Sequence, residues 1–297
     1  MSKPWILVSP ASRGIGHALT RHLLRTTTAP ILATARTDLP GVRSSILNSL
    51  STTSSEEKDA VSKRLHLTHL DVTSEPSLAS ASAEARRLFP AETHHLRLAF
   101  ALPGVLRPEK SPADVDYDAA LRTLRVNVLG PLMLMKWFGD FLPRKSVEVS
   151  LDPLFTSALP TTSESESEDR GGEEGGGKGK ASPHATFLLA SARVGSTSDN
   201  RLGGWYTYRA SKSAVISLAR TYDLFLRNRS GDKAVSIAYH PGTVRTDLSR
   251  EYWDRVRPEK LFTPEYAAER MVEIVRTRRV AEHRGRCWDW RGEEVLP

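Results

Sequence analysis

The chain opens with Trp5-Ile-Leu-Val-Ser9, and Pro10-Ala-Ser-Arg-Gly-Ile-Gly16 follows directly. The first five residues form an almost continuous apolar run, which is typical of a parallel strand that is covered on both faces. The next residues contain two glycines, and an amphipathic segment begins at about 16–26. Glycines between a strand and a helix allow the backbone to approach a phosphate group at the helix N-terminus. This stretch therefore predicts a strand, a phosphate-binding turn and a helix.

Strands and helices alternate along the remaining chain. Further strands are predicted at 30–35, 66–70, 96–102, 187–190 and 235–239. Helices are predicted within 43–64 and at 76–89, 114–142, 205–228 and 264–279, with a short tail after the last one. This alternation indicates an α/β fold, a single Rossmann-type, doubly wound parallel sheet with helices on both faces. We expect one domain over residues 1–297.

One segment interrupts that alternation. Residues 160–183 contain Ser163-Glu-Ser-Glu-Ser-Glu-Asp169 and the glycine-rich run Gly175-Gly-Gly-Lys-Gly-Lys180. Such a polar tract cannot bury enough apolar surface to order itself. We interpret residues 146–183 as a flexible, low-complexity insertion within the domain, and an acidic regulatory segment is the alternative.

Composition excludes several function classes. The 297 residues are 39% hydrophobic and carry a formal net charge of +7, but the basic residues are scattered and form no recognisable nucleic-acid motif. No apolar run is long enough to span a membrane, and no His, Cys or acidic spacing predicts a metal site. Cys287 is the single cysteine, which excludes an internal disulfide. The N-terminus leaves no room for a signal peptide, so we expect a cytoplasmic protein.

The end of the second predicted strand indicates which dinucleotide would bind. NAD sites usually place a carboxylate there, to hold the ribose 2′-hydroxyl. This chain has Arg36 at that position and Arg13 in the glycine turn, and a guanidinium is the natural partner of a 2′-phosphate. Asp38 could mimic the NAD carboxylate, but it falls two residues late. We therefore expect NADP(H), with NAD(H) as the less favoured cofactor.

A tyrosine and a lysine stand one helical turn apart in the segment predicted at 205–228. Tyr208 and Lys212 are four residues apart, which places both side chains on one face of a helix. A fixed cation near a phenol stabilises the phenolate and lowers the pKa of the phenol, as acid–base catalysis requires. Tyr206 is the poorer candidate, because Ala210 stands one turn after it.

With these residues in place, the chain resembles the short-chain dehydrogenase/reductase superfamily over nearly its whole length. The resemblance is carried by five motifs in the order that the family uses: Ser12-Arg-Gly-Ile-Gly16, Leu70-Asp71-Val72, Asn127, Tyr208-x-x-x-Lys212 and His240-Pro-Gly-Thr-Val-Arg-Thr246. Within the superfamily, Ser191-Ala-Arg-Val-Gly-Ser196 and the tail Trp288-Asp-Trp-Arg-Gly292 are similar to the C-factor-like branch.

The resemblance implies a role for each matching residue. Tyr208 would be the acid or base, and Lys212 would lower the pKa of Tyr208 and bind the nicotinamide ribose. Asn127 would hold a water that links Lys212 to solvent. The cofactor would be bound by these three residues together with Ser9, Ser12, Arg13, Gly14, Ile15, Gly16, Arg36, Asp71, Val72, Gly104, Pro241, Gly242, Val244 and Thr246.

Three positions depart from the family pattern. The glycine motif begins with Ser9-Pro10 instead of Thr-Gly, and Leu102-Pro103-Gly104 replaces Asn-Ala-Gly. Counting back three residues from Gly195, where the family has its catalytic serine, gives Ala192. We choose the neighbouring Ser191 as the catalytic serine, with Ser196 as the second candidate.

These residues together predict an NADP(H)-dependent oxidoreductase, a carbonyl reductase or alcohol dehydrogenase (EC 1.1.1.-). It would transfer a hydride between nicotinamide and a small-molecule carbonyl or alcohol. The region with Leu248, Tyr252 and Trp253, together with Trp205, predicts an apolar substrate site. Family habit implies a homo-oligomer. The alternative is a catalytically weak dinucleotide-binding redox sensor or signalling protein, which the departures at Pro10, Pro103 and the serine would favour.

Overall fold

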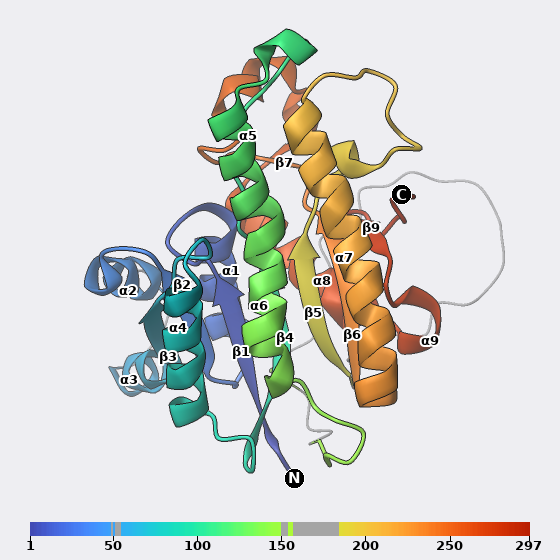
Figure 1. Cartoon of the computed structure of the whole chain (residues 1–297). Helices are drawn as coiled ribbons and strands as arrows, with labels where there is room; N and C mark the ends of the chain where they lie inside the picture. The colour runs from blue at the N-terminus through green and yellow to red at the C-terminus, as the bar shows by residue number, and fades with distance from the viewer. Residues whose placement is uncertain (49, 51–54, 150–153, 157–183) are drawn as a thin grey trace, which may run out of the picture.

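The computed structural model describes residues 1–48, 50, 55–149, 154–156 and 184–297. Its centre is a seven-stranded parallel sheet with the order β3-β2-β1-β4-β5-β6-β9, and helices cover both faces (Figure 1). The strands of this sheet are β1 (Lys3–Ser9), β2 (Ile31–Ala35), β3 (Leu65–His69), β4 (His94–Ala101), β5 (Ala185–Ala190), β6 (Ala234–His240) and β9 (Cys287–Asp289). The predicted fold class is confirmed.

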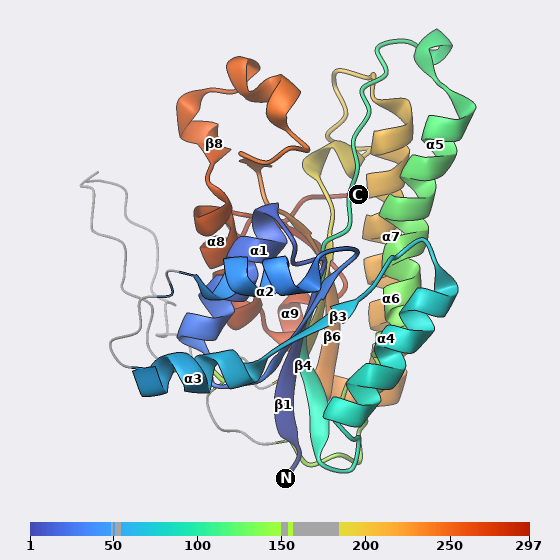
Figure 2. The same cartoon turned by 90° about the vertical axis from the view of Figure 1, so that its left-hand side faces the viewer.

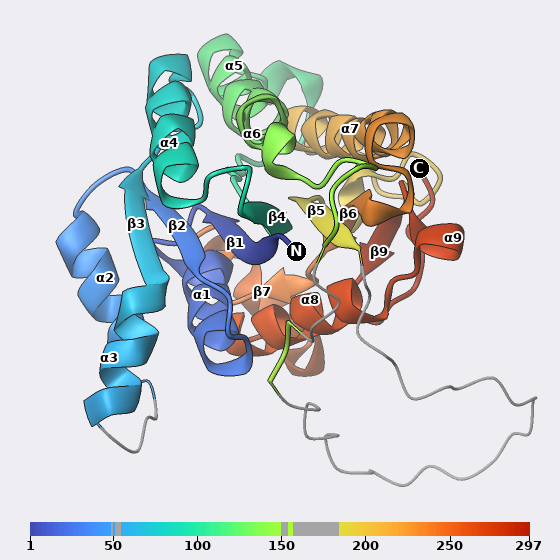
Figure 3. The same ribbon diagram turned by 90° about the horizontal axis from the view of Figure 1, so that it is seen from below.

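The helices divide between the two faces, as Figures 2 and 3 show. One face carries α4 (Glu75–Leu88), α5 (Tyr117–Leu124), α6 (Gly130–Phe138) and α7 (Tyr206–Ser230). The other side carries α1 (Gly14–Thr26), α2 (Leu39–Leu47), α3 (Ser55–Arg64), α8 (Pro264–Thr277) and α9 (Val280–His283). A separate two-stranded ribbon pairs β7 (Thr243–Val244) with β8 (Leu261–Phe262).

Strand β1 is buried on both faces, which explains why its sequence is apolar at successive positions. Ile6 and Val8 belong to the hydrophobic cluster under α1 and α8, whereas Trp5 and Leu7 belong to the cluster under α4, α6 and α7. Successive side chains of a strand point to opposite faces, so both sets are buried. The burial of this strand on both faces fixes the position of the turn that follows Ser9.

The long helix predicted at 114–142 is wrong in one respect. It is interrupted by a π-helical turn at Arg125–Leu129 between α5 and α6. Asn127 lies in this turn, and its side chain bonds to Val105 and Ser211 instead of facing solvent. An added residue in a helical turn commonly accompanies a functional site, and here it brings Asn127 between two elements of the candidate site.

The prediction of a short tail after residue 279 is also wrong. Cys287–Asp289 forms the edge strand β9, which pairs in parallel with β6 through Tyr239 and Trp288. The strand is only three residues long and contains a buried aspartate, so neither period nor apolarity marks it in the sequence. Asp289 is buried because its carboxylate accepts a hydrogen bond of 2.8 Å from Arg193 and further bonds from the backbone at Arg291 and Glu293.

The predicted flexible insertion at 146–183 lies mostly outside the described residues. Its described parts contact the domain, because Val149 forms a bridge with Ser2 and Phe155 forms one with Thr27. Leu154 and Phe155 are buried in the cluster under α1 and α8. These described residues belong to the packed fold.

None of the helices in the described ranges has the length and apolarity needed to cross a membrane.

Candidate functional site

A cavity of about 1020 Å³ lies at the carboxyl ends of β1, β2 and β4. The strand order reverses here, with β2 on one side of β1 and β4 on the other, and open α/β sheets bind ligands at such a point. The predicted cofactor-binding residues that line it are Ser9, Ser12, Arg13, Gly14, Ile15, Gly16, Arg36, Asp71, Val72, Gly104, Pro241 and Thr246. Residues predicted from several separate loops therefore line the same cavity.

The glycine turn after β1 opens the cavity at the start of α1. Gly14 has a φ of +55°, which strains any residue with a Cβ. A Cβ on Gly16 would lie 1.9 Å from the Pro10 carbonyl oxygen, so only glycine allows α1 to approach the end of β1 this closely. The first turn of α1 holds no acidic residue, and no side chain caps it. The helix N-terminus can therefore receive an anion from the cavity.

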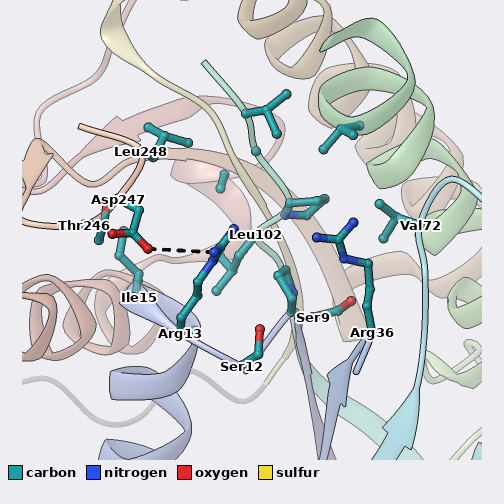
Figure 4. Close-up of a pocket in the computed structure, with 18 of the residues that line it drawn as sticks. Ser9, Ser12, Arg13, Ile15, Arg36, Val72, Leu102, Thr246, Asp247 and Leu248 are labelled. Atoms are coloured by element: carbon teal, nitrogen blue, oxygen red, sulfur yellow. Dashed lines mark ion pairs between the residues drawn. The ribbon is translucent and has the colours of Figure 1, made fainter. Parts of the chain in front are cut away.

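Two arginines reach into this end of the cavity, as Figure 4 shows for Arg13 and Arg36. The Arg13 guanidinium lies 3.7 Å from the Asp247 carboxylate, on the loop across the cavity. Asp38, which could have mimicked the carboxylate of an NAD site, is instead the N-cap of α2. Its side chain accepts a hydrogen bond of 3.0 Å from the Gly41 amide. The end of β2 thus offers the cavity a cation.

Asp71 follows β3 and stays a carboxylate. Burial raises its pKa, but hydrogen bonds from the Thr73 amide and hydroxyl outweigh this effect, and with the positive charge of Arg36 they hold the pKa below its ordinary value. Both Thr73 bonds, of 2.8 and 2.7 Å, go to the same oxygen of Asp71. The other oxygen has no partner among the described hydrogen bonds, so it can accept a donor such as an amino group.

Tyr208 and Lys212 lie on one face of α7, as their spacing predicted. The Lys212 ammonium lies 5.7 Å from the centre of the Tyr208 ring and donates a hydrogen bond of 2.8 Å to the Ala190 carbonyl. Ala190 and Gly104 line the cavity, and a Cβ on Gly104 would lie 3.8 Å from the ammonium nitrogen. The pair therefore stands directly behind one end of the cavity.

The electrostatics of this pair differ from the expectation that Lys212 lowers the pKa of Tyr208. Burial, with a smaller effect of Tyr252, raises the pKa of Tyr208 above its ordinary value. Burial also lowers the pKa of Lys212 to about 8. The pKa of Tyr208 is not lowered because both groups are buried and the Lys212 ammonium is directed at the Ala190 carbonyl. The phenol consequently keeps its proton at neutral pH.

Asn127 connects the cavity wall to α7. Its side chain accepts a hydrogen bond of 2.8 Å from the Val105 amide and donates one of 2.9 Å to the Val105 carbonyl. Its second amide hydrogen goes to the Ser211 hydroxyl, at 3.0 Å. Asn127 therefore holds the loop after β4 against α7. The role of Asn127 in a proton relay stays a prediction.

Besides Asn127, Tyr208 and Lys212, three more predicted residues are not among those that line the cavity. The Ser191 hydroxyl is buried and donates a hydrogen bond of 3.0 Å to the Lys212 carbonyl. Gly242 has a φ of +77° and packs under Phe262, while Val244 is buried in the β7–β8 ribbon. Gly242 and Val244 shape the loop that carries Pro241 and Thr246 to the cavity. The role of Ser191 toward a substrate stays a prediction.

No sequence motif indicates Glu109 or Asp247. Glu109 lies in the loop after β4 and is buried, although no motif marks it. Its carboxylate accepts hydrogen bonds of 2.7 Å and 2.5 Å from the Thr207 amide and hydroxyl, and its carbonyl accepts one of 2.6 Å from the Trp205 amide. A carboxylate at a helix N-terminus satisfies free amides and the helix dipole. Glu109 thereby fixes the first turn of α7, which begins at Tyr206, two residues before Tyr208.

Replacing Glu109 with alanine is expected to destabilise the protein by roughly 1–3 kcal/mol, because the Thr207 amide and hydroxyl lose a charged acceptor. Urea unfolding measures this change. Glu109→Gln is the matched control, since it keeps one acceptor oxygen and should lose less. An unchanged unfolding midpoint for Glu109→Ala, at equal slope, would contradict the assigned role.

Comparisons with known proteins agree with this geometry. No family model matches the chain. The 1-hydroxy-2-glutathionyl-2-methyl-3-butene dehydrogenase of Rhodococcus sp. (strain AD45) is 26% identical over 208 residues, which are 69% of this chain and 69% of that protein. C-signal of Myxococcus xanthus is 28% identical over 182 residues, covering 61% of this chain and 81% of that protein.

Among solved structures, the NADPH-bound carbonyl reductase from chicken fatty liver superposes with a TM-score of 0.71 at 20% identity, covering 100% of both chains. This likeness concerns the fold. The match to C-signal agrees with the predicted C-factor-like branch. Motifs, strand order and relatives thus agree with the resemblance of the chain to the short-chain dehydrogenase/reductase superfamily.

Proposed function

We propose that the protein is an NADP(H)-dependent oxidoreductase that reduces a small-molecule carbonyl or oxidises the corresponding alcohol, with Tyr208 as the acid or base. The observation that carries this proposal is a single cavity with two arginines at one end and the buried Tyr208–Lys212 pair behind the other. The solved relative from chicken fatty liver binds NADPH, and the Rhodococcus relative is a dehydrogenase.

The cavity residues fit a dinucleotide with a 2′-phosphate. The cavity volume of about 1020 Å³ is at the upper end of the range of roughly 300–1,000 Å³ for ligand pockets. A Cβ on Gly104 would make only ordinary contacts with Leu248 and Lys212, so packing within the protein does not require glycine there. The space that Gly104 leaves open faces the cavity and suits the close approach of a flat ring.

The two ends of the cavity would bind different parts of the cofactor. Arg13 and Arg36 would hold the 2′-phosphate by charge-assisted hydrogen bonds, and the amides at the start of α1 would hold the pyrophosphate. Lys212, whose pKa of about 8 leaves it charged at neutral pH, would donate to the ribose hydroxyls. When bound, NADPH would supply the hydride for carbonyl reduction.

Tyr208 would supply the proton. Since burial raises its pKa, the hydroxyl is protonated at neutral pH and can give its proton to an oxygen that becomes basic as the carbonyl is reduced. Lys212, whose ammonium lies 5.7 Å from the ring centre, would stabilise the phenolate left behind. Leu248 lines the cavity, and Trp205 packs on Tyr208 with ring centres 6.0 Å apart. Such apolar groups would exclude water from the reacting atoms.

The cofactor assignment is tested with Arg36→Ser. We expect NADPH affinity to fall about 10–100-fold, which is the cost of one or two charge-assisted hydrogen bonds, while NADH affinity changes little. Fluorescence titration with both dinucleotides measures the two affinities. Arg87→Ser is the matched control, because Arg87 is exposed and its ion pair within the described residues is with Glu84 in α4. An equal loss of NADPH and NADH affinity would exclude a 2′-phosphate contact at Arg36.

A further inference from the structure

Reduction of a carbonyl is helped by a second hydrogen-bond donor on the oxygen that becomes negative, beside the acid itself. The two candidate serines, Ser191 and Ser196, are buried and hydrogen-bonded within the fold, and neither is among the residues that line the cavity. The Ser191 hydroxyl donates to the Lys212 carbonyl at 3.0 Å. The Ser196 hydroxyl is buried and accepts a 3.1 Å bond from the Asp199 amide. Ala192, at the position where the family has its serine, carries no hydroxyl.

Tyr252 has a hydroxyl that is not hydrogen-bonded to any described residue. It lies in the 3-10 helix Arg250–Arg255, in the segment between β7 and β8. Its phenolic oxygen is buried, and within the described residues it has no hydrogen-bond partner. A buried hydroxyl left without a partner is unfavourable, and a hydrogen bond to a bound ligand oxygen would relieve this.

The Tyr252 ring is held near Tyr208 by Trp205. The ring centres of Trp205 and Tyr252 lie 4.9 Å apart, and those of Trp205 and Tyr208 lie 6.0 Å apart. Trp205 itself is fixed in place, because its backbone has a left-handed φ of +53° and its amide donates to the Glu109 carbonyl at 2.6 Å. Strained residues of this kind cluster at functional sites.

The two phenols also interact electrostatically. Tyr252 is the one side chain, besides the effect of burial, that raises the pKa of Tyr208. Negative charge on one phenol is therefore felt by the other.

We propose that the Tyr252 hydroxyl, in place of a serine, is the second hydrogen-bond donor to the substrate oxygen, beside Tyr208. This inference rests on the proposed function. Tyr252 would donate a hydrogen bond without transferring its proton, and Tyr208 would give the proton.

Tyr252→Phe tests the inference, because phenylalanine keeps the ring that packs on Trp205. We expect kcat/KM for an aldehyde or ketone with NADPH to fall roughly 10–100-fold, a loss typical of a removed oxyanion donor. NADPH affinity should stay at its wild-type value and the urea unfolding midpoint should not fall, since the hydroxyl has no hydrogen-bond partner within the described residues. Tyr206→Phe is the matched control, as Tyr206 is 43% exposed and two residues from Tyr208.

The results separate the two proposals. If the wild type reduces a carbonyl, Tyr208→Phe is inactive and Tyr252→Phe keeps wild-type kcat/KM, the inference on Tyr252 is wrong and the proposed function stands. A lower unfolding midpoint for Tyr252→Phe would also overturn it, because the hydroxyl would then have a structural partner. If the wild type reduces no carbonyl with NADPH, both proposals fail.

Discussion

Tyr208→Phe is expected to lower kcat by roughly 10²–10⁴-fold, the contribution typical of a general acid. The phenol lies with Lys212 behind the Gly104 end of the cavity. Phenylalanine keeps the ring and its packing against Trp205, so the cavity should keep its shape. The loss should therefore appear in kcat, while NADPH affinity remains within about twofold of wild type.

Steady-state kinetics and NADPH titration of the same preparation measure both quantities. Tyr206→Phe again serves as the control, because it removes an exposed hydroxyl from the same helix. Wild-type turnover by Tyr208→Phe would mean that another group donates the proton, and the mechanism proposed above would then be wrong.

Lys212→Met is expected to separate stability from activity. The Lys212 side chain is buried and its pKa is lowered from 10.5 to about 8 by that burial. A group that binds its proton less tightly in the folded state destabilises the fold at neutral pH, here by about 3 kcal/mol. Methionine fills a similar volume without the charge, although it leaves the Ala190 carbonyl without its donor. We expect equal or greater stability at neutral pH, by up to about 2 kcal/mol.

The pH dependence of this effect has a definite sign. Between pH 8 and 10.5 the unfolded chain binds more protons than the folded chain at Lys212, so the stability of the wild type rises with pH in that window. The advantage of Lys212→Met should be fully present below pH 8 and should disappear as the pH approaches 10.5. Urea unfolding at several pH values measures it.

Turnover of Lys212→Met should fall by at least about 100-fold, because the phenolate of Tyr208 and the ribose hydroxyls both lose their cation. A marked loss of stability at neutral pH, in place of a gain, would show that the ammonium is better compensated than its burial implies. Unchanged turnover would remove Lys212 from the proposed mechanism.

The sequence predicted the parts of the fold that repeat a simple pattern. Strands such as Trp5–Ser9 are buried on both faces, and their apolar runs are visible without any knowledge of the fold. The edge strand Cys287–Asp289 was missed because a short strand with a buried, charge-paired aspartate has no such pattern. The π turn at Arg125–Leu129 was missed because it depends on the contacts of Asn127 with Val105 and Ser211, which are remote in sequence.

The site follows the same division. Residues next to a strand end, such as Arg13 and Arg36, could be placed at the cavity because parallel strands end at one edge of the sheet. Glu109 could not be placed, since its contact with Trp205 depends on how separate loops meet. Tyr252 was expected at the substrate site, but its packing against Trp205 could not be predicted. Ser191 was selected by its distance in sequence from Gly195, whereas the direction of a hydroxyl depends on its neighbour, here the Lys212 carbonyl.

We propose that the cavity binds NADPH and that Tyr208 supplies a proton to the carbonyl oxygen of the substrate as it is reduced. The most direct measurement is the consumption of NADPH by the wild type with a panel of aldehydes, ketones and quinones, together with the amount of alcohol formed. We predict that at least one compound consumes NADPH with an equal amount of product and that Tyr208→Phe does not support this turnover. Tight binding of NADPH with no turnover on any compound would contradict the claim and would favour a dinucleotide-binding sensor.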